Sequence, residues 1–193
     1  GCDKLSLKNN TLIKSDLVTI DLNGIAQGFS VDYLSNYLYS HNILNFMIEI
    51  GGEVRCSGTN FGKVWKIAID KPTDKKREWD MILKLNNMSL ATSGSYRNYY
   101  YADSIKISHT INPKTLKPTH NKLISATILY SDCISADAYA TACMAFGLKG
   151  AKKFLTKNNI LGCLIYIEEE DTIAYLSEGF SDFLHTSPRS APQ

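Results

Sequence analysis

The arrangement of the chain depends on one stretch, Ser135 to Gly147, which reads SADAYATACMAFG. It begins with Ser135, a residue type favoured at helix N-caps, and it contains no Gly or Pro before Gly147, so we predict one short helix. Small side chains at positions 136, 138, 140, 142 and 145 would let a neighbouring backbone or a ligand come close. A second helix is predicted from Lys149 to Thr156.

Two oxygen-bearing side chains share one face of this predicted helix. Asp137 and Thr141 are four residues apart, so a carboxylate and a hydroxyl lie near each other. Two hard oxygen ligands suit Mg²⁺, which takes one or two protein groups plus substrate phosphates. Alternatively, Asp137 is an acid favoured by the helix dipole and Thr141 is a satisfied core hydroxyl. Taken alone, the stretch favours this second interpretation.

The rest of the chain predicts strands in antiparallel pairs. We therefore expect an α+β fold of mainly antiparallel sheets with two to three packed helices. Residues 1–186 are predicted to form a single domain, and residues 187–193 a disordered tail. An N-terminal hairpin is expected within residues 4–22, followed by a helix over 25–40. Further strands are predicted at 46–50, 54–58, 64–69, 81–85, 89–92, 105–111, 124–130, 162–168 and 172–176.

Composition excludes several classes of protein. The 193 residues carry a net charge of +2, too small to indicate a nucleic-acid partner or a membrane surface. No apolar run of about 18 residues exists, so no spanning helix is expected. The five cysteines show no metal-finger spacing, and their odd number argues against a fully paired disulfide framework.

Two glycine-containing segments are candidate ligand sites. The segment DLNGIAQGFSVD, residues 21–32, predicts a strand that ends in a glycine-spaced helix entry, whose backbone N–H groups would bind an anion. A plain strand-to-helix turn is the alternative. In EIGGE, residues 49–53, an acid follows two glycines and could bond a ligand hydroxyl or ring nitrogen. A bulge with an outward Glu53 is equally compatible with the pattern.

Two further segments combine hydroxyls, aromatics and a histidine. The segment ATSGSYRNYY, residues 91–100, suits a flat heteroaromatic ligand that needs hydrogen bonds and stacking. The alternative is a surface loop whose tyrosines pack on the sheet. In SHTINPKT, residues 108–115, His109 could accept the proton of a substrate hydroxyl. A lone strand histidine is more often structural.

Together, the segments DLNGIAQGFSVD, IGGE, ATSGSYRNYY, SHTINPKT and SADAYATA resemble, in order and spacing, the ApbE-type FAD:protein FMN transferases. The resemblance implies a T-fold-like α+β protein and a Mg²⁺-dependent bacterial enzyme. Such enzymes cleave the FAD pyrophosphate, join FMN by a phosphoester to a Ser or Thr of a target flavoprotein, and release AMP. The resemblance covers the C-terminal two-thirds of the family's length. The usual N-terminal portion, which helps enclose adenine and flavin, is not matched.

The resemblance also implies residue roles. Asp137 and Thr141 would be metal ligands, with a backbone carbonyl at Ala26 completing the shell. His109 or Asp137 would accept the hydroxyl proton, and the choice stays open. The remaining predicted FAD contacts are Gly24, Ile25, Ala26, Gly28, Gly51, Gly52, Glu53, Thr92, Ser93, Gly94, Tyr96 and His109.

The chain departs from the family pattern at a few positions. Gln27 stands where the family usually has Lys, which removes a positive charge beside the phosphates. Glu49, Asn112 and Leu116 also differ from the usual residues. A FAD pyrophosphatase that yields FMN and AMP, and a non-catalytic FAD-binding protein, therefore remain as alternatives.

The resemblance further implies a compartment. We expect an extracytoplasmic location, periplasmic or on the inner membrane of a bacterium as a lipoprotein, with membrane association only through an anchor not present in this chain.

Overall fold

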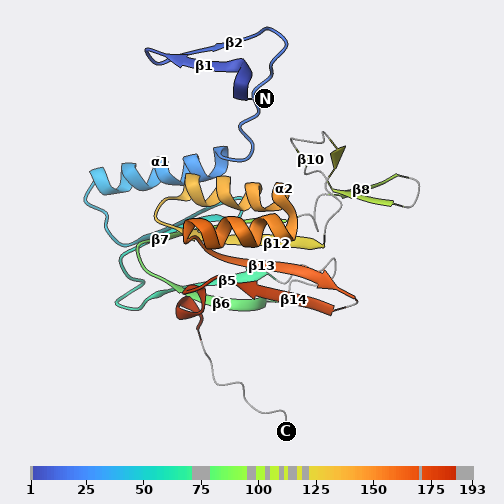
Figure 1. Ribbon diagram of the computed structural model, residues 1–193. Coiled ribbons are helices and arrows are strands. Elements are labelled where there is room, and N and C mark those ends of the chain that lie inside the picture. Colours follow the sequence, from blue (N-terminus) through green and yellow to red (C-terminus); the bar gives the residue numbers. More distant parts are fainter. Residues whose placement is uncertain are drawn as a thin grey trace.

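A six-stranded antiparallel sheet forms the centre of the computed structural model, with two helices on one face (Figure 1). The structure describes residues 2–70, 79–94, 99–102, 105–108, 111–112, 117–118, 122–169 and 171–185. The helices are α1 (Ala26–Ser40) and α2 (Cys133–Asn158), and short 3-10 turns lie at η1 (Cys2–Lys4) and η2 (Phe180–Phe183). The α+β fold expected from the sequence is confirmed.

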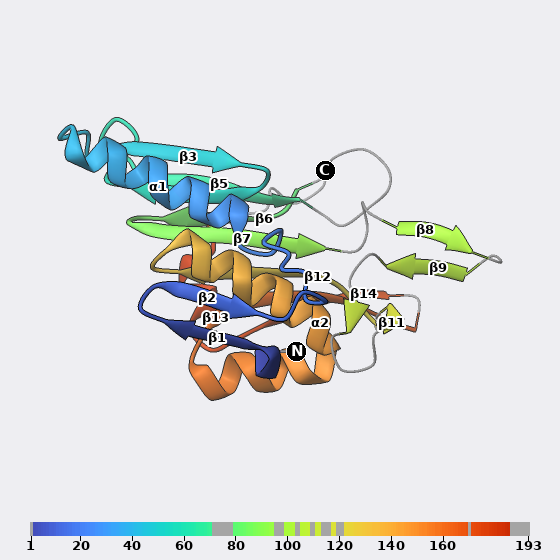
Figure 2. The same ribbon diagram turned by 90° about the horizontal axis from the view of Figure 1, so that it is seen from above.

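The sheet has the strand order β14-β13-β12-β7-β4-β3. These six strands are β3 (Phe46–Ile50), β4 (Glu53–Ser57), β7 (Met88–Gly94), β12 (Leu123–Tyr130), β13 (Leu161–Glu168) and β14 (Asp171–Leu176). Every pairing between them is antiparallel. Figure 2 shows β3 at the outer edge, with α1 running over it.

Separate two-stranded sheets complete the described chain. They pair β1 (Leu5–Lys8) with β2 (Thr11–Lys14), β5 (Trp65–Asp70) with β6 (Trp79–Leu85), β8 (Tyr99–Ala102) with β9 (Ile105–Ser108), and β10 (Ile111–Asn112) with β11 (Lys117–Pro118). The hairpin β5–β6 covers the face of the main sheet opposite the helices (Figure 1).

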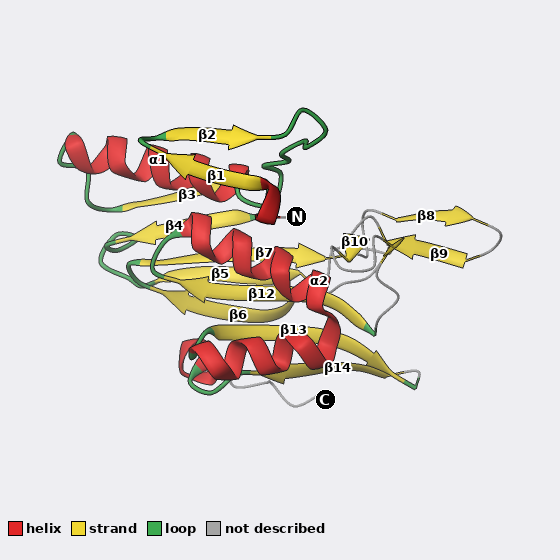
Figure 3. Cartoon of the chain, turned by 45° about the horizontal axis from the view of Figure 1, so that its top comes forward, coloured by secondary structure: helices red, strands yellow, loops and turns green. Residues whose placement is uncertain are grey.

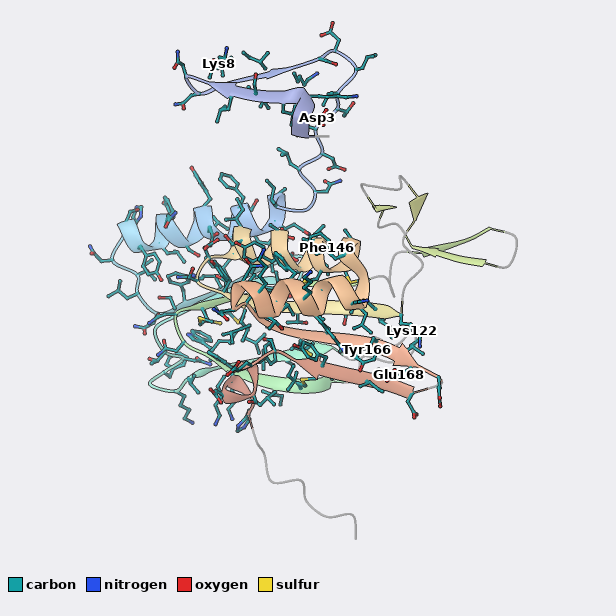
Figure 4. All side chains as sticks on the ribbon, viewed as in Figure 1. Asp3, Lys8, Lys122, Phe146, Tyr166 and Glu168 are labelled. Atoms are coloured by element: carbon teal, nitrogen blue, oxygen red, sulfur yellow. The ribbon has the colours of Figure 1, made fainter. Side chains whose placement is uncertain are left out.

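Two cores lie on the two faces of the main sheet, because successive side chains of a strand point to opposite faces. One core joins β7, β12 and β13 to α2 and includes Ala91, Ile128 and Met144. The other joins the sheet to β5–β6 and η2 and includes Leu83 and Phe180. Figure 4 shows side chains filling these layers.

The central helix differs from its prediction at its start. Its N-cap is Asp132, whose Oδ1 accepts a hydrogen bond from the Ser135 N–H at 2.9 Å, so the predicted cap at Ser135 is wrong. The break at Gly147 is confirmed, since its φ of 69° and ψ of 174° are not helical. A second helical segment follows, runs back in the opposite direction over the same face of the sheet (Figure 3), and ends at Asn159 in the left-handed conformation.

The N-terminal hairpin is shorter than expected and lies away from the main sheet. Its second strand ends at Lys14, so the predicted extension to Asp21 is wrong. Leucines of this region are exposed, with Leu7 72% and Leu17 97% accessible. Figure 4 shows the hairpin, marked by Asp3 and Lys8, outside the packed layers.

Candidate functional site

The first turn of α1 lies directly against the start of α2. The backbone N–H of Gly28 donates a hydrogen bond of 3.0 Å to Oδ2 of Asp137, across 109 residues of sequence. A Cβ at Gly28 would overlap the Cys133 carbonyl group and lie 2.8 Å from the Ile134 Cα atom. The absence of a side chain at Gly28 therefore permits the helix crossing that brings Asp137 to the backbone of α1.

Asp137 is a buried carboxylate, with 3% of its surface accessible. Burial raises the pKa of this carboxyl, because the charged form loses its hydration, and the Gly28 N–H lowers it by stabilising that form. The group therefore has one donor fixed by the fold and a larger tendency to hold a proton than an exposed aspartate.

One turn further along α2, Thr141 meets two other predicted segments. Its Oγ1 lies 3.2 Å from Oγ of Ser93 on β7. A Cβ at Gly24 would lie 3.2 Å from Cγ2 of Thr141, so the loop before α1 passes close to the same side chain. The helical face predicted from the spacing of Asp137 and Thr141 thus gathers Gly24, Gly28 and Ser93 around it.

The segment EIGGE, residues 49–53, contributes to the site through a tight turn. Gly51 and Gly52 form the two-residue turn between β3 and β4, with φ of 69° and 111°, the region that glycine adopts at little cost. A Cβ at Gly51 would overlap the side-chain amide of Gln27 and lie 3.3 Å from Oε2 of Glu53. The turn therefore brings Gln27 and Glu53 together beside α1.

Glu53 is buried, not turned outward. It is 4% accessible, and its Oε2 has no hydrogen-bond partner in the described part of the chain. Burial, and to a smaller extent the nearby charge of Asp137, raise the pKa of Glu53 to about 7. A buried carboxyl oxygen without a donor is costly, so this atom is suited to a group that the chain itself does not supply.

Some predicted site residues are not brought into this group. Oγ1 of Thr92 lies 2.9 Å from Oγ1 of Thr127, and strand alternation puts both on the sheet face opposite Ser93. Gly94 ends β7, while Tyr96 and His109 lie outside the described residues.

The expected anion site at the start of α1 is partly used by the fold itself. The N–H groups of Ile25 and Ala26 both donate to the Leu22 carbonyl, and that of Gly28 donates to Asp137. The Ala26 carbonyl, the expected third metal ligand, accepts a 2.8 Å hydrogen bond from the Ser30 hydroxyl. A metal ion at that oxygen would compete with Ser30.

Sequence reasoning missed Asp32, which fixes the start of α2 from the middle of α1. Its carboxylate accepts hydrogen bonds of 2.9 Å from the Cys133 N–H and 2.8 Å from the Ile134 N–H. A carboxylate satisfies the free amides of a helix N-terminus and interacts favourably with its dipole. No signal in the sequence links positions that are 101 residues apart.

The donor set fits a hard cation held in part by backbone and substrate. No group of three His, Cys, Asp or Glu residues suitable for a metal occurs among the described residues. Asp137 and Thr141 supply two oxygens on one helical face, and Glu53 adds a nearby carboxyl with a free oxygen. Few protein ligands together with substrate oxygens are what Mg²⁺ prefers, so these residues are compatible with it.

Comparisons with known proteins agree with one another. The model of the ApbE family matches residues 1–165. The FAD:protein FMN transferase of Vibrio cholerae is 38% identical over 186 residues, which cover 95% of this chain and 56% of the relative. That of Escherichia coli K12 is 32% identical over 166 residues, covering 86% and 47%. The chain thus spans about half the length of the curated relatives it matches.

Solved structures give the same result. The flavin transferase ApbE from Vibrio cholerae superposes with a TM-score of 0.86 at 36% identity, covering 95% of this chain and 59% of that one. The ApbE protein from Thermotoga maritima gives a TM-score of 0.84 at 27% identity, covering 96% and 60%. Separately, no helix in the described part of the chain is long and apolar enough to cross a membrane.

Proposed function

The chain belongs to the ApbE family, and from this premise we propose that it takes part in Mg²⁺-dependent transfer of FMN from FAD to a protein. The acceptor would be a Ser or Thr hydroxyl of a target flavoprotein, and AMP would leave. One observation carries the proposal most directly. Asp137 bonds the backbone of Gly28 while Thr141, one turn on, lies against Ser93 and Gly24, so segments far apart in sequence converge on one helical face.

Mg²⁺ would be held by Asp137 and Thr141, with the Ala26 carbonyl as a third oxygen once the Ser30 hydroxyl turns away from it. When bound, the ion would offset the negative charge of the pyrophosphate. The turn at Gly51 and the helix entry at Gly24 would let substrate groups approach the backbone closely. Glu53, with its free oxygen, would accept a hydrogen bond from a substrate hydroxyl or ring nitrogen.

The proton of the attacking hydroxyl needs an acceptor, and two residues remain candidates. Burial raises the pKa of Asp137, so its ionised carboxylate would bind a proton more strongly than that of an exposed aspartate, and a bound metal ion would compete with that proton. His109 is the alternative that the family resemblance implies. Its replacement by Ala should lower transfer by roughly 10²–10⁴ and leave FAD binding nearly unchanged if it is the base.

The central test uses Asp137→Asn. An asparagine oxygen can still accept the Gly28 N–H, whereas alanine would leave that buried amide without a partner. The protein is incubated with FAD, Mg²⁺ and a Thr-containing acceptor peptide, and the products are separated by mass spectrometry. We expect flavinylated peptide and AMP from the unmodified chain and at least a hundredfold loss in Asp137→Asn.

Asp16→Asn, at an exposed carboxylate, is the matched control and should retain full activity. Free FMN with AMP and no modified peptide would instead indicate a FAD pyrophosphatase. FAD that is bound but unchanged would indicate a binding protein. Undiminished turnover in Asp137→Asn would remove the proposed metal site.

We also propose an extracytoplasmic location, which rests on the family resemblance alone. Fractionation of cells that produce the full native polypeptide tests it. Recovery only with cytoplasmic markers would exclude this location.

A further inference from the structure

Strand β3 pairs with β4 on one side and, among the described residues, has no partner strand on its other side. It is the last strand in the order β14-β13-β12-β7-β4-β3, within the part of the chain that the structure describes. In a two-residue hairpin the pair next to the turn, Ile50 and Glu53, exchanges hydrogen bonds and the pattern then alternates. Met47 and Glu49 therefore direct their backbone N–H and C=O groups toward the open edge, where an added strand could bind.

A cavity of about 370 Å³ lies beside this edge. Its lining residues are Met47, Asn60, Lys63, Val64, Trp65 and Lys66. The Trp65 indole N–H donates a 2.9 Å hydrogen bond to the Ser57 carbonyl, which fixes the ring as a wall. Met47 is 42% accessible although it faces an apolar wall, so an apolar side chain of a partner would be well accommodated there.

Positive charge gathers on the same side of the molecule. Lys66 on β5 stands directly opposite Lys84 on β6, an arrangement that like charges disfavour. The Lys66 ammonium lies 2.9 Å from Nε2 of His185, and burial together with both lysines lowers the pKa of His185. No described carboxylate lies within ion-pair distance of Lys63, Lys66 or Lys84. An acidic partner would relieve this repulsion.

The loop that lines the cavity also presents an unusual aromatic side chain. Phe61 occupies a tight turn closed by the two backbone hydrogen bonds between Asn60 and Lys63. Its φ is 49°, uncommon for a bulky residue, and its side chain is fully exposed. Both the backbone conformation and the apolar exposure are unfavourable in the isolated chain, and Phe61 lies in the turn between the lining residues Asn60 and Lys63, where a bound partner would be close to it.

We propose that the β3 edge and this cavity bind an extended acidic segment of the acceptor protein as an added strand. This inference rests on the proposed function, whose protein substrate it describes. Met47 at the cavity and Gly51 at the candidate site are four residues apart, about 13 Å along a strand. A segment with its acidic residue at Lys63 and Lys66 would therefore place a hydroxyl three to five residues away beside Glu53 and Asp137.

The charged side chains along β3 also determine which end of the bound acceptor segment should be acidic. Glu49 is exposed on β3 close to the Gly51 turn, so an acidic side chain there would be repelled. The lysines lie at the other end of the strand. The segment should thus carry acidic residues near the cavity and neutral, hydroxyl-bearing residues near the candidate site.

The binding experiment uses a fluorescein-labelled nine-residue peptide of alternating Val and Thr with two Glu at one end. Controls are the same peptide with Gln in place of Glu and one with alternate backbone amides N-methylated. Fluorescence anisotropy measures the dissociation constants with the full chain. We expect the Gln peptide and the N-methylated peptide to bind at least tenfold more weakly than the Glu peptide.

Variants locate the site. Lys63→Glu and Lys66→Glu should each weaken the Glu peptide at least tenfold, whereas Lys149→Glu, on an exposed part of α2, should change it less than twofold. Equal binding of the Glu and Gln peptides, or unchanged binding in both charge-reversal variants, would overturn the proposal. A dimer in sedimentation velocity that Lys66→Glu dissociates would also overturn it, because a second copy would then occupy the edge.

A second assay tests the docking proposal separately from the proposed function. It measures FAD cleavage in the absence of an acceptor, with the released AMP as the readout. Lys66→Glu should leave that cleavage unchanged. A chain that cleaves FAD but does not bind the Glu peptide refutes the docking edge alone. A chain that binds the Glu peptide through Lys66 but neither binds nor cleaves FAD refutes the proposed function and supports the docking edge as a protein-binding site.

Discussion

At Glu53 the fold buries a carboxyl beside a second carboxyl without supplying a donor to its Oε2. The pKa near 7 means that the folded protein binds more protons than the unfolded chain between about pH 4.5 and 7. Stability should therefore fall as pH rises through this window. We expect Glu53→Gln to remove the decrease and to stabilise the metal-free protein at pH 8 by about 1–2 kcal/mol.

Urea unfolding of the metal-free protein from pH 4 to 8 measures this effect. Glu49→Gln is the control, since Glu49 is exposed on the neighbouring strand and is the weakest of the groups that raise the pKa of Glu53, so its variant should keep most of the decrease. A stability profile that is the same in the unmodified chain and in Glu53→Gln would show that folding does not raise the pKa of Glu53.

The sequence predicted the pairing of Asp137 with Thr141, but it did not predict the burial of Glu53 or the contacts of Asp32. The shared face of Asp137 and Thr141 followed from helical spacing alone, because four residues make about one turn. The burial of Glu53 did not, because the sequence does not show that the Gly51 turn lies against α1. Asp32 was missed for the same reason, since its partners at the start of α2 are set by tertiary packing.

Among the elements, the crossing of α1 and α2 depends on a single hydrogen atom at Gly28. A methyl group there would overlap the Cys133 carbonyl, and backbone cannot move aside as a flexible side chain can. We expect Gly28→Ala to destabilise the protein by about 2–3 kcal/mol, in the upper range for overpacking. Thermal or urea unfolding monitored by circular dichroism measures it.

Gly24→Ala is the control for that substitution. Its new methyl group would meet only the Thr141 side chain, at 3.2 Å, which a small shift can relieve. A destabilisation of Gly24→Ala equal to that of Gly28→Ala would show that general loss of glycine flexibility, and not the helix crossing, accounts for the effect.

At the scale of the whole molecule, local pairings could be predicted and the order of the sheet could not. The hairpins β1–β2, β3–β4 and β13–β14 follow from alternation and turn residues close in sequence. The placement of β7 between β4 and β12 pairs residues that are 31 to 41 positions apart in the chain, and neither alternation nor propensity encodes such neighbours. The family resemblance implied a T-fold-like α+β protein and the roles of the site residues, but it was not used to predict a strand order.

Cation binding should also change the stability of the whole molecule. A cation that binds only the folded chain at Asp137 and Thr141 stabilises it by about 2.7 kcal/mol at a concentration a hundred times its dissociation constant. We expect Mg²⁺ to raise the unfolding midpoint of the unmodified chain and not that of Asp137→Asn. Equal shifts in both, measured by differential scanning calorimetry with Ca²⁺ as a comparison ion, would place the cation elsewhere.

The two helices hold each other reciprocally, because Asp32 of α1 binds the amides that begin α2 while Asp137 of α2 binds an amide of the first turn of α1. Neither helix start can open without breaking a bond to the other. The amide hydrogens of Gly28, Cys133 and Ile134 should therefore exchange with solvent deuterium at one common rate, as a single opening unit, although they lie on two helices a hundred residues apart. Asp32→Ala should speed hydrogen exchange at Gly28 as well as at Cys133 and Ile134, the two partners of Asp32. Loss of the hydrogen bonds at the start of α2 would therefore also destabilise the start of α1.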